Sequence, residues 1–403
     1  MDRFTLIVFA LVYIGMIVGK YPGLAMDRTG MALLGAIALI VAGRVGEADA
    51  WAAIDVPTII LLLGLMVVSS QLRLGGFYTF VTRKIASANL TPSAFLALVI
   101  ASMAALAAVL TNDVICLAVT PVLLEGCSRR NLNPVPYLLA LACASNIGSA
   151  ATLIGNPQNM LIGQALNLSF AGYLFDAAIP SALGLIVVWV VIVLHTRGRW
   201  HAETPIPEYE AQPFDSWQSA KGLAAILALI LVFLFTDWPR DIVALGAAGF
   251  LLLSRRMASR TIMGLVDWHL LLLFMGLFVV NHAVETTGIL PKIVEALRVR
   301  AIDIEQPAWL FIVTVVLSNL VSNVPAAMLL LPSATHESAG PILALASTLA
   351  GNLFIVGSIA NIIVVEQAAR YGTRITWQEH ARIGLPVTVI TLAIAAAWLW
   401  LIG

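Results

Sequence analysis

The sequence predicts an all-α polytopic membrane protein of two inverted repeats, each with five crossings, one re-entrant hairpin and one helix broken at the bilayer midplane. Three observations support this prediction. Hydrophobic residues fill 60% of the 403 positions and charged residues only 11%, a composition that soluble domains do not have. Motifs of the first half recur in the second half about 211 positions later. In each half, a polar segment containing glycine interrupts a long apolar stretch.

Windows of about 20 apolar residues predict the membrane-spanning helices. In the first half we expect spans at 4–19, 29–43, 53–72, 135–164 (broken) and 171–195. In the second half we expect them at 218–236, 240–254, 268–284, 340–366 (broken) and 381–402. Two further apolar stretches, interrupted by polar residues at their centres, are predicted hairpins at 92–127 and 306–336. Short amphipathic helices are expected at 77–88 and 289–300.

The chain divides into a first repeat at 1–196, a polar cytoplasmic linker at 197–216 and a second repeat at 217–403. The apolar start is expected to be a retained span, because no small-residue cleavage pattern follows it. Lys plus Arg equals Asp plus Glu at 22 each, so net charge indicates no nucleic-acid partner. The three cysteines have no metal-ligand spacing and are expected to be small core residues.

The internal repeat is visible residue by residue. Asp55, Gly64 and Gly76 recur 212 positions later as Asp267, Gly276 and Gly288. Thr111-Asn112 recurs as Ser322-Asn323 at a spacing of 211, and the segment 155–159 corresponds to 357–361. An odd number of crossings in each half inverts the second half relative to the first. The 22 Lys and Arg residues then divide sixteen to six between the two sides. By the positive-inside rule the richer side is cytoplasmic, which places both termini outside.

The segment 145–159 is expected to break its helix. It reads Ser-Asn-Ile-Gly-Ser-Ala-Ala-Thr-Leu-Ile-Gly-Asn-Pro-Gln-Asn, and Pro157 removes a helical hydrogen bond while Gly148 and Gly155 tolerate other conformations. Irregular backbone at membrane depth survives only inside protein or beside a wet cavity, and such breaks form binding sites in secondary transporters. The simpler alternative is a kinked helix whose asparagines bond to neighbouring helices.

Each hairpin has a polar tip, Thr111-Asn112-Asp113 in the first half and Ser322-Asn323-Val324-Pro325 in the second. A carboxylate at the bilayer centre is costly, so Asp113 should face protein, water or an ion. Two tips meeting two broken helices would assemble one site near the midplane. The candidate substrate- or ion-binding residues are Thr111, Asn112, Asp113, Ser145, Asn146, Gly155, Asn156, Asn159, Ser322, Asn323, Asn352, Gly357, Ser358 and Asn361.

These motifs resemble a known family. Leu110-Thr-Asn-Asp-Val114, the 145–159 segment, Ser322-Asn-Val-Pro325 and Gly357-Ser-Ile-Ala-Asn361 are similar to the arsenical-pump and anion-permease family. Its superfamily also holds divalent-anion/sodium symporters, citrate-metal transporters and the melanosomal P protein, and the Gly-Asn-Pro-Gln-Asn segment is most similar to silicon-efflux transporters. The resemblance implies an elevator-type homodimer. Its scaffold would take spans 29–72 and 240–284, and its mobile transport part would take 92–195 and 304–402.

The leading functional prediction is a secondary active transporter in the inner (plasma) membrane that exports a small inorganic oxyanion or weak acid, of the arsenite or silicic-acid type, by proton exchange. Asparagines supply the neutral donors and acceptors that suit hydroxylated ligands. Asp113 is the first candidate to carry the coupling proton or sodium, and the alternative is a carboxylate held by backbone amides. No cofactor is expected beyond the coupling ion. The partners expected are substrate, membrane lipid and a second copy of the chain, and any ATPase subunit would have to be a separate protein.

Two alternatives remain open, a sodium-coupled anion or dicarboxylate importer and a sodium/proton antiporter. The sodium–dicarboxylate relatives carry Ser-Asn-Thr at both tips, and neither tip matches here, which counts against dicarboxylate recognition. An enzyme is not expected, because the sequence has no His-Glu-x-x-His or Gly-x-Ser-x-Gly motif and its six histidines are scattered. Among these, His282 is interpreted as an interfacial histidine.

Overall fold

The computed structural model describes residues 2–19, 26–202, 212–254 and 256–402. The first half contains α1 (Arg3–Val18), α2 (Arg28–Val41), α3 (Glu47–Ala53), α4 (Val56–Leu74), α5 (Phe77–Ala86), α6 (Pro92–Val109), α7 (Asn112–Arg129), α8 (Pro134–Ala150), α9 (Pro157–Ala165) and α10 (Phe170–Thr196). The second half contains α11 (Ser216–Phe235), α12 (Arg240–Leu252), α13 (Ser259–Met263), α14 (Trp268–Thr286), α15 (Ile289–Arg298), α16 (Pro307–Val321), α17 (Asn323–Leu330), η1 (Leu331–Ser333), α18 (Ala339–Ala350), η2 (Ile355–Gly357), α19 (Ile359–Arg370) and α20 (Trp377–Ile402).

The all-helical prediction is confirmed. Within the described residues, six helices are long and apolar enough to cross a membrane, namely α4, α6, α10, α11, α14 and α20. Both predicted breaks are present, between α8 and α9 and between α18 and α19, and both predicted hairpins turn at their polar centres. The middle of the predicted linker, including Pro205 and Pro207, lies outside the described residues.

The helices of the second half follow the order of the first, so that α11 to α20 correspond to α1 to α10. Local structure repeats with them. Asp55 caps α4 by accepting from the Thr58 amide, and Asp267 caps α14 by accepting from the Leu270 amide. Gly76 and Gly288 precede α5 and α15 with φ of +69° and +64°, a conformation that glycine adopts without strain. The same residues therefore produce the same local turns in both halves.

The two halves also pack into each other. Helix α4 packs on α12 of the other half, and α14 packs on α2. At each crossing a glycine allows close approach, since a Cβ on Gly64 would lie 2.7 Å from the Ala244 backbone and one on Gly276 would lie 2.8 Å from the Ala32 backbone. Ala32 and Ala244 are themselves 212 positions apart. Each half thus supplies the packing partner that the other needs.

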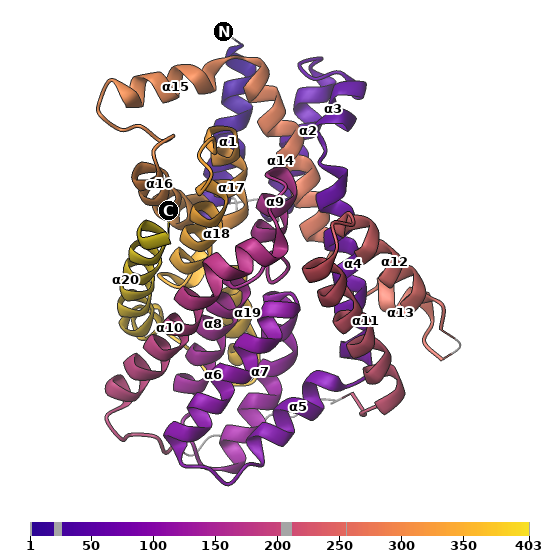
Figure 1. The fold of residues 1–403 in the computed structure, drawn as a ribbon, viewed down its shortest axis with the longest axis vertical. Coiled ribbons are helices and arrows are strands. Elements are labelled where there is room, and N and C mark those ends of the chain that lie inside the picture. The colour runs from indigo at the N-terminus through magenta and orange to yellow at the C-terminus, as the bar shows by residue number, and fades with distance from the viewer. Residues whose placement is uncertain (1, 20–25, 203–211, 255, 403) are drawn as a thin grey trace.

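These crossings form one bundle of α2, α4, α12 and α14, and a second bundle contains α6 to α10 and α16 to α20. In the second bundle α6 packs on α8, α16 on α18, α10 on α20 and α7 on α19. Figure 1 shows α5 and α15, which connect the bundles in each half, at opposite ends of the molecule.

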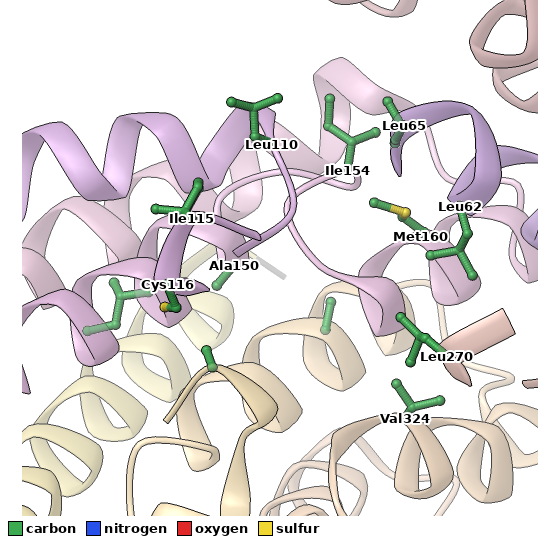
Figure 2. Packing of buried hydrophobic residues seen from close by; sticks show 14 of the residues in the cluster. Leu62, Leu65, Leu110, Ile115, Cys116, Ala150, Ile154, Met160, Leu270 and Val324 are labelled. Atoms are coloured by element: carbon green, nitrogen blue, oxygen red, sulfur yellow. The ribbon is translucent and has the colours of Figure 1, made fainter. Parts of the chain in front are cut away.

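The contact between the bundles near the breaks is apolar. Helix α9 packs on α4, and α17 packs on α14. Figure 2 shows Met160 of α9 beside Leu62 and Leu65 of α4, and Leu270 of α14 beside Val324 of α17. All five side chains are buried. The hairpin tips and the breaks therefore lie just behind a buried apolar contact between the two bundles.

Candidate functional site

The first break is closed by its own residues. Asn156 precedes Pro157 at the start of α9, and its side chain accepts a hydrogen bond of 2.9 Å from the Asn159 amide. This is the usual arrangement of an asparagine N-cap followed by proline in the first turn. The second break differs, because Ser358 at the start of α19 makes no such cap. Its hydroxyl donates instead to Asn146 Oδ1, at 2.9 Å.

One asparagine braces each break in the same way. Asn159 Nδ2 donates to the carbonyls of Ser149 and Thr152, at 3.4 and 2.9 Å. Asn361 Nδ2 donates to the carbonyls of Gly351 and Phe354, at 2.8 and 3.1 Å. In both cases the acceptors stand ten and seven residues before the asparagine. These two amides satisfy carbonyls that the broken helices leave without a helical partner.

The braces are in turn held by the opposite half. Asn361 Oδ1 accepts from Asn146 Nδ2 at 3.1 Å, and Asn159 Oδ1 accepts from Thr348 Oγ1 at 3.3 Å. Asn146 and Thr348 are 202 positions apart, as are Asn159 and Asn361. The contact from the first half to the second is thus repeated from the second to the first.

Asn146 is the centre of this network. Its Nδ2 donates to Asn352 Oδ1 at 3.0 Å as well as to Asn361, and its Oδ1 accepts from Asn112 Nδ2 at 3.2 Å as well as from Ser358. An amide side chain has two donor hydrogens and two acceptor lone pairs. Asn146 uses all four to join the first hairpin tip to the second break.

The first tip rests on the first break and keeps polar atoms unpaired. The backbone amide of Asn112 donates to the Gly155 carbonyl at 3.1 Å. Among the described residues, Asn112 Oδ1, Thr111 Oγ1 and Asn352 Nδ2 are buried without a hydrogen-bond partner. Buried polar groups are nearly always paired, so these three atoms are free to contact a ligand. Together they offer acceptors and a donor without net charge.

The second tip is more tightly bound. With its amide oriented to satisfy its neighbours, Asn323 donates to the carbonyls of Ser347 and Gly357 and accepts from Gln158 Nε2, at 3.0, 3.2 and 3.2 Å. The preceding Ser322 has φ +78° and ψ 162°, a region that only glycine enters without strain. Strained backbone of this kind clusters at binding sites and switch regions.

Asp113 lies in the first turn of α7, directly after the tip, and its side chain is partly buried. No hydrogen bond or ion pair joins its carboxylate to another described residue. Among the described residues, no backbone amide donates to this carboxylate, as the alternative of a structural role would require. The nearby carboxylate of Asp267, at the start of α14, acts on it electrostatically. A proton or a cation bound at Asp113 would weaken the repulsion between the two acids.

Not every predicted residue joins the network. Ser145 donates to the Ala142 carbonyl and contacts Cys116 Sγ, at 3.0 and 3.1 Å, so it serves α8 and α7. Gly155 and Gly357 contribute close backbone contacts, since a Cβ at either would meet the preceding turn. No group of three His, Cys, Asp or Glu that suits a metal ion occurs within the described ranges. A sodium ion here would have to use neutral oxygen atoms and Asp113.

Sequence reasoning missed five participants, namely Ser149, Gln158, Thr348, Tyr173 and His380. Asn156 Nδ2 donates to Ser149, and Gln158 Nε2 donates to Thr348, at 3.0 and 3.1 Å. Tyr173 donates to the Ala150 carbonyl at 2.7 Å, and His380 Nε2 donates to the Asn352 carbonyl at 3.1 Å. Tyr173 is the fourth residue of α10 and His380 is the fourth residue of α20, the last helix of each half. The equivalent positions of Tyr173 and His380 in the internal repeat are the signal that could have identified them.

Known proteins resemble this chain over nearly its whole length. A family model described as a citrate transporter (CitMHS) matches residues 6–350. An uncharacterized transporter of Mycobacterium tuberculosis is 30% identical, over 97% of this chain and 98% of that one. The silicon efflux transporter LSI3 of rice (Oryza sativa subsp. japonica) is 28% identical, over 93% of this chain and 92% of its own. The crystal structure of the Alcanivorax borkumensis YdaH transporter shares the fold, with a TM-score of 0.60 at 13% identity over 99% of this chain and 96% of that one.

Proposed function

Because this chain belongs to the citrate transporter (CitMHS) family of membrane transporters, we propose that it is a secondary active transporter that exports a small inorganic oxyanion or weak acid in exchange for protons. The observation that carries this proposal is the neutral, incompletely paired polar site between the tips and the breaks. Weak acids of the arsenite or silicic-acid type are uncharged hydroxylated molecules near neutral pH. Their hydroxyl groups can donate to Asn112 Oδ1 and Thr111 Oγ1 and accept from Asn352 Nδ2.

Charge favours this substrate class over citrate. No lysine or arginine takes part in the described hydrogen bonds that join Asn112, Asn146, Asn352 and Asn361. A trivalent carboxylate in a site without a cation would lose its hydration without compensation. A neutral hydroxylated molecule meets no such cost. The rice relative carries silicon efflux in its name, which agrees with this choice.

The mechanism we propose is alternating access by two inverted repeats. The exchange of equivalent contacts between the halves and the opposite placement of α5 and α15 support inversion (Figure 1). The bundle of α2, α4, α12 and α14 would be the scaffold, and the bundle with tips and breaks would be the transport domain. The apolar surface around Met160 (Figure 2) presents few directional bonds to break when one bundle slides past the other.

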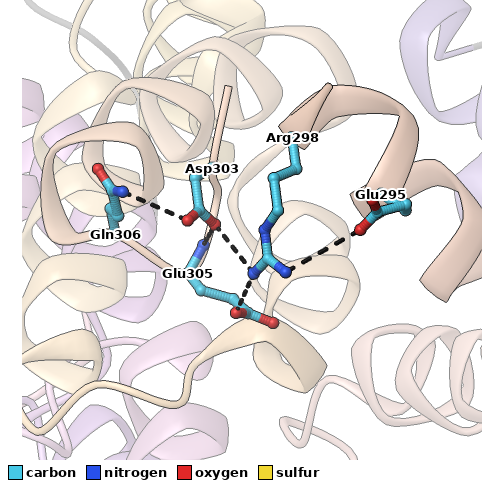
Figure 3. Close-up of polar contacts among 5 residues, drawn as sticks. All are labelled: Glu295, Arg298, Asp303, Glu305 and Gln306. Carbon is cyan, nitrogen blue, oxygen red and sulfur yellow. Dashed lines mark hydrogen bonds and ion pairs between the residues drawn. The ribbon is translucent and has the colours of Figure 1, made fainter. Parts of the chain in front are cut away.

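Orientation follows from the charges at the two ends. At the end with α5, Arg83 and Arg129 share the buried Glu125 carboxylate, at 3.1 and 2.9 Å. At the end with α15 the ratio is reversed, and Arg298 faces three acids, with contacts of 4.0 Å to Glu295, 3.5 Å to Asp303 and 2.6 Å to Glu305 (Figure 3). The positive-inside rule makes the α5 end cytoplasmic. We propose that both termini lie outside the inner membrane and that the protein is a homodimer.

A second candidate function is sodium-coupled uptake of a carboxylate, which the description of the matching family favours. Purified protein in liposomes separates the two. We expect a pH gradient, and not a sodium gradient, to drive accumulation of arsenite, antimonite, germanate or silicate. Citrate uptake driven by sodium would contradict the proposal. Growth of a sensitised bacterium expressing the chain gives a second measure, with Asn112→Ala as the inactive control.

A further inference from the structure

One polar contact crosses between the two bundles at the end of α9. Arg240, the first residue of α12, donates from Nη2 to the Gly163 carbonyl at 2.7 Å and to Gln164 Oε1 at 3.4 Å. Gly163 and Gln164 are the seventh and eighth residues of α9, near its C-terminus. The last carbonyls of a helix lack helical partners and carry the negative end of its dipole. A guanidinium at this position therefore holds α9 against the scaffold in the present conformation.

The other half has residues at the equivalent positions, in the middle of the longer helix α19, but not the contact. Arg28 is the first residue of α2, 212 positions before Arg240, and the seventh and eighth residues of α19 are Val365 and Glu366. Within the described part of the chain, the Arg28 side chain makes no hydrogen bond or ion pair. Glu366 is exposed. The structure is thus asymmetric at this pair of equivalent positions, because α9 is bound by Arg240 and α19 is not bound by Arg28.

We propose that Arg28 binds α19 in the opposite transport state, through the exposed Glu366 carboxylate in the middle of that helix, while Arg240 releases α9. This inference rests on the alternating access proposed above. In a protein of two inverted repeats, the second state is obtained when the halves exchange conformations, so every contact made by one half is made by the other. Arg28 and Arg240 are then positioning residues that hold the transport domain in alternate states.

The chemistry of the two contacts is not the same. Gln164 offers Arg240 a neutral amide oxygen, whereas Glu366 offers Arg28 a carboxylate, and charge-assisted hydrogen bonds are the stronger kind. A pocket of about 670 Å³ lies beside Arg240, lined in part by Asp55, Asn167 and Asp237, so the guanidinium can leave α9 without disrupting a packed core. We therefore expect the α19 contact to be the stronger of the two and the state it holds to be sensitive to salt.

Cross-linking tests the contact without any transport assay. Arg28→Cys with Glu366→Cys is treated in membranes with a short bifunctional methanethiosulfonate, and the linked peptides are identified by mass spectrometry. Arg240→Cys with Gln164→Cys is the positive control for the present state, and Arg28→Cys with Gln164→Cys is the negative control. The three native cysteines are buried and serve as internal background. We expect both matched pairs to cross-link and the mismatched pair not to. A positive control that links while the Arg28–Glu366 pair does not, with or without substrate and gradient, overturns the proposal.

Charge exchange supplies a readout that a merely structural role would not give. We expect Arg28→Glu and Glu366→Arg each to lower the maximal transport rate by about tenfold, with little change in KM, because they alter the population of one state. The double variant should recover most of the rate, whereas Arg28→Glu with Gln164→Arg should not. Failure of the double variant to recover, in protein that still folds, overturns the pairing. If the cross-links form but no tested solute moves, the substrate proposal falls and the pairing stands.

Discussion

The two breaks are built from residues at equivalent positions, but only at the first break does the residue before the second helix cap that helix. Asn156 caps α9, while Ser358 at the same position of the second break turns to Asn146 in the other half. The braces Asn159 and Asn361 make the same contacts at both breaks. The features shared by both halves hold the broken helices together. The features that differ are gathered around Asn146, and two residues that contact it, Asn112 and Asn352, each keep a buried atom without a hydrogen-bond partner.

The tips differ in the same sense. Thr111 has φ −65° in ordinary extended backbone, whereas Ser322 has φ +78°. Asp113 follows the first tip, and the buried Val324 follows the second. The first tip is thus followed by a charged residue, and the second tip has strained backbone at Ser322. Symmetry describes the scaffold of the site, and the departures from symmetry indicate where transport makes unequal demands on the halves.

The largest effect is expected at the tip asparagines. Asn112→Ala and Asn323→Ala should each lower transport by more than about a hundredfold, because each removes a polar group from the site. Stability should distinguish them. Asn112 has an unpaired Oδ1, whereas Asn323 pairs with Ser347, Gly357 and Gln158, so its loss leaves buried partners unsatisfied. We expect Asn323→Ala to cost about 1–3 kcal/mol and Asn112→Ala to cost less.

Proteoliposome uptake and thermal unfolding in detergent measure the two quantities on the same preparations. Asn89→Ala, an exposed position between α5 and α6 and outside the network, is a control for loss of an amide. Equal destabilisation by the two asparagine variants would remove the distinction between a bound tip and an open one. Equal losses of folded protein and of transport in both would favour the simpler alternative of structural asparagines.

The next effect concerns the charge that only the first half carries. Asp113→Asn should abolish accumulation driven by a pH or sodium gradient while leaving exchange of substrate across the membrane. An isosteric amide keeps the shape of the site but cannot gain or lose the coupling ion. Asp176→Asn, a partly exposed acid on α10, is the control and should behave as wild type. A variant that still concentrates substrate against its gradient would show that Asp113 is not the coupling group.

The caps give a third comparison of smaller size. Asn156→Ala removes a helix cap, which costs about 1 kcal/mol of stability, and we expect transport to fall by less than about tenfold. Ser358→Ala removes no cap but takes a donor from Asn146, so it should lower transport more and stability less. Unfolding temperature and initial uptake rate, plotted against each other, test this inversion. The same ratio of effects in both variants would contradict it.

Much of this structure could be predicted from sequence because it depends on signals that act locally. Apolar windows and the proline after Asn156 placed the helices and the first break, and the recurring Asp and Gly pairs revealed the internal repeat. The tips were found because a polar residue inside an apolar stretch is expensive. These signals need no knowledge of which helices meet.

The partners within the site could not be predicted, because they depend on how the halves meet. Thr348 stands in ordinary helical sequence, and nothing marks it as the partner of Asn159. Ser149 lies in the 145–159 segment, but the segment does not show that Ser149 accepts from Asn156. The sequence also did not show that residues at equivalent positions make different contacts in the two halves. Arg28 and Arg240 look alike in sequence, and only the structure shows that one is engaged and the other is not.

The smallest effect concerns the strain at the second tip. Ser322→Gly should stabilise the protein by about 1 kcal/mol. A residue with a Cβ loses about 1–3 kcal/mol at φ +78° and ψ 162°, and glycine avoids this cost. Part of the gain is offset because glycine has greater conformational freedom in the unfolded chain. Thr111→Gly is the matched control, and it should destabilise by about 1 kcal/mol since Thr111 has no strain to relieve. Thermal unfolding should therefore shift in opposite directions for the two variants. If strain at Ser322 helps the tip to switch between states, the stabilised variant will also transport more slowly. Destabilisation by glycine at both tips would mean that the backbone of Ser322 is no more strained than that of Thr111.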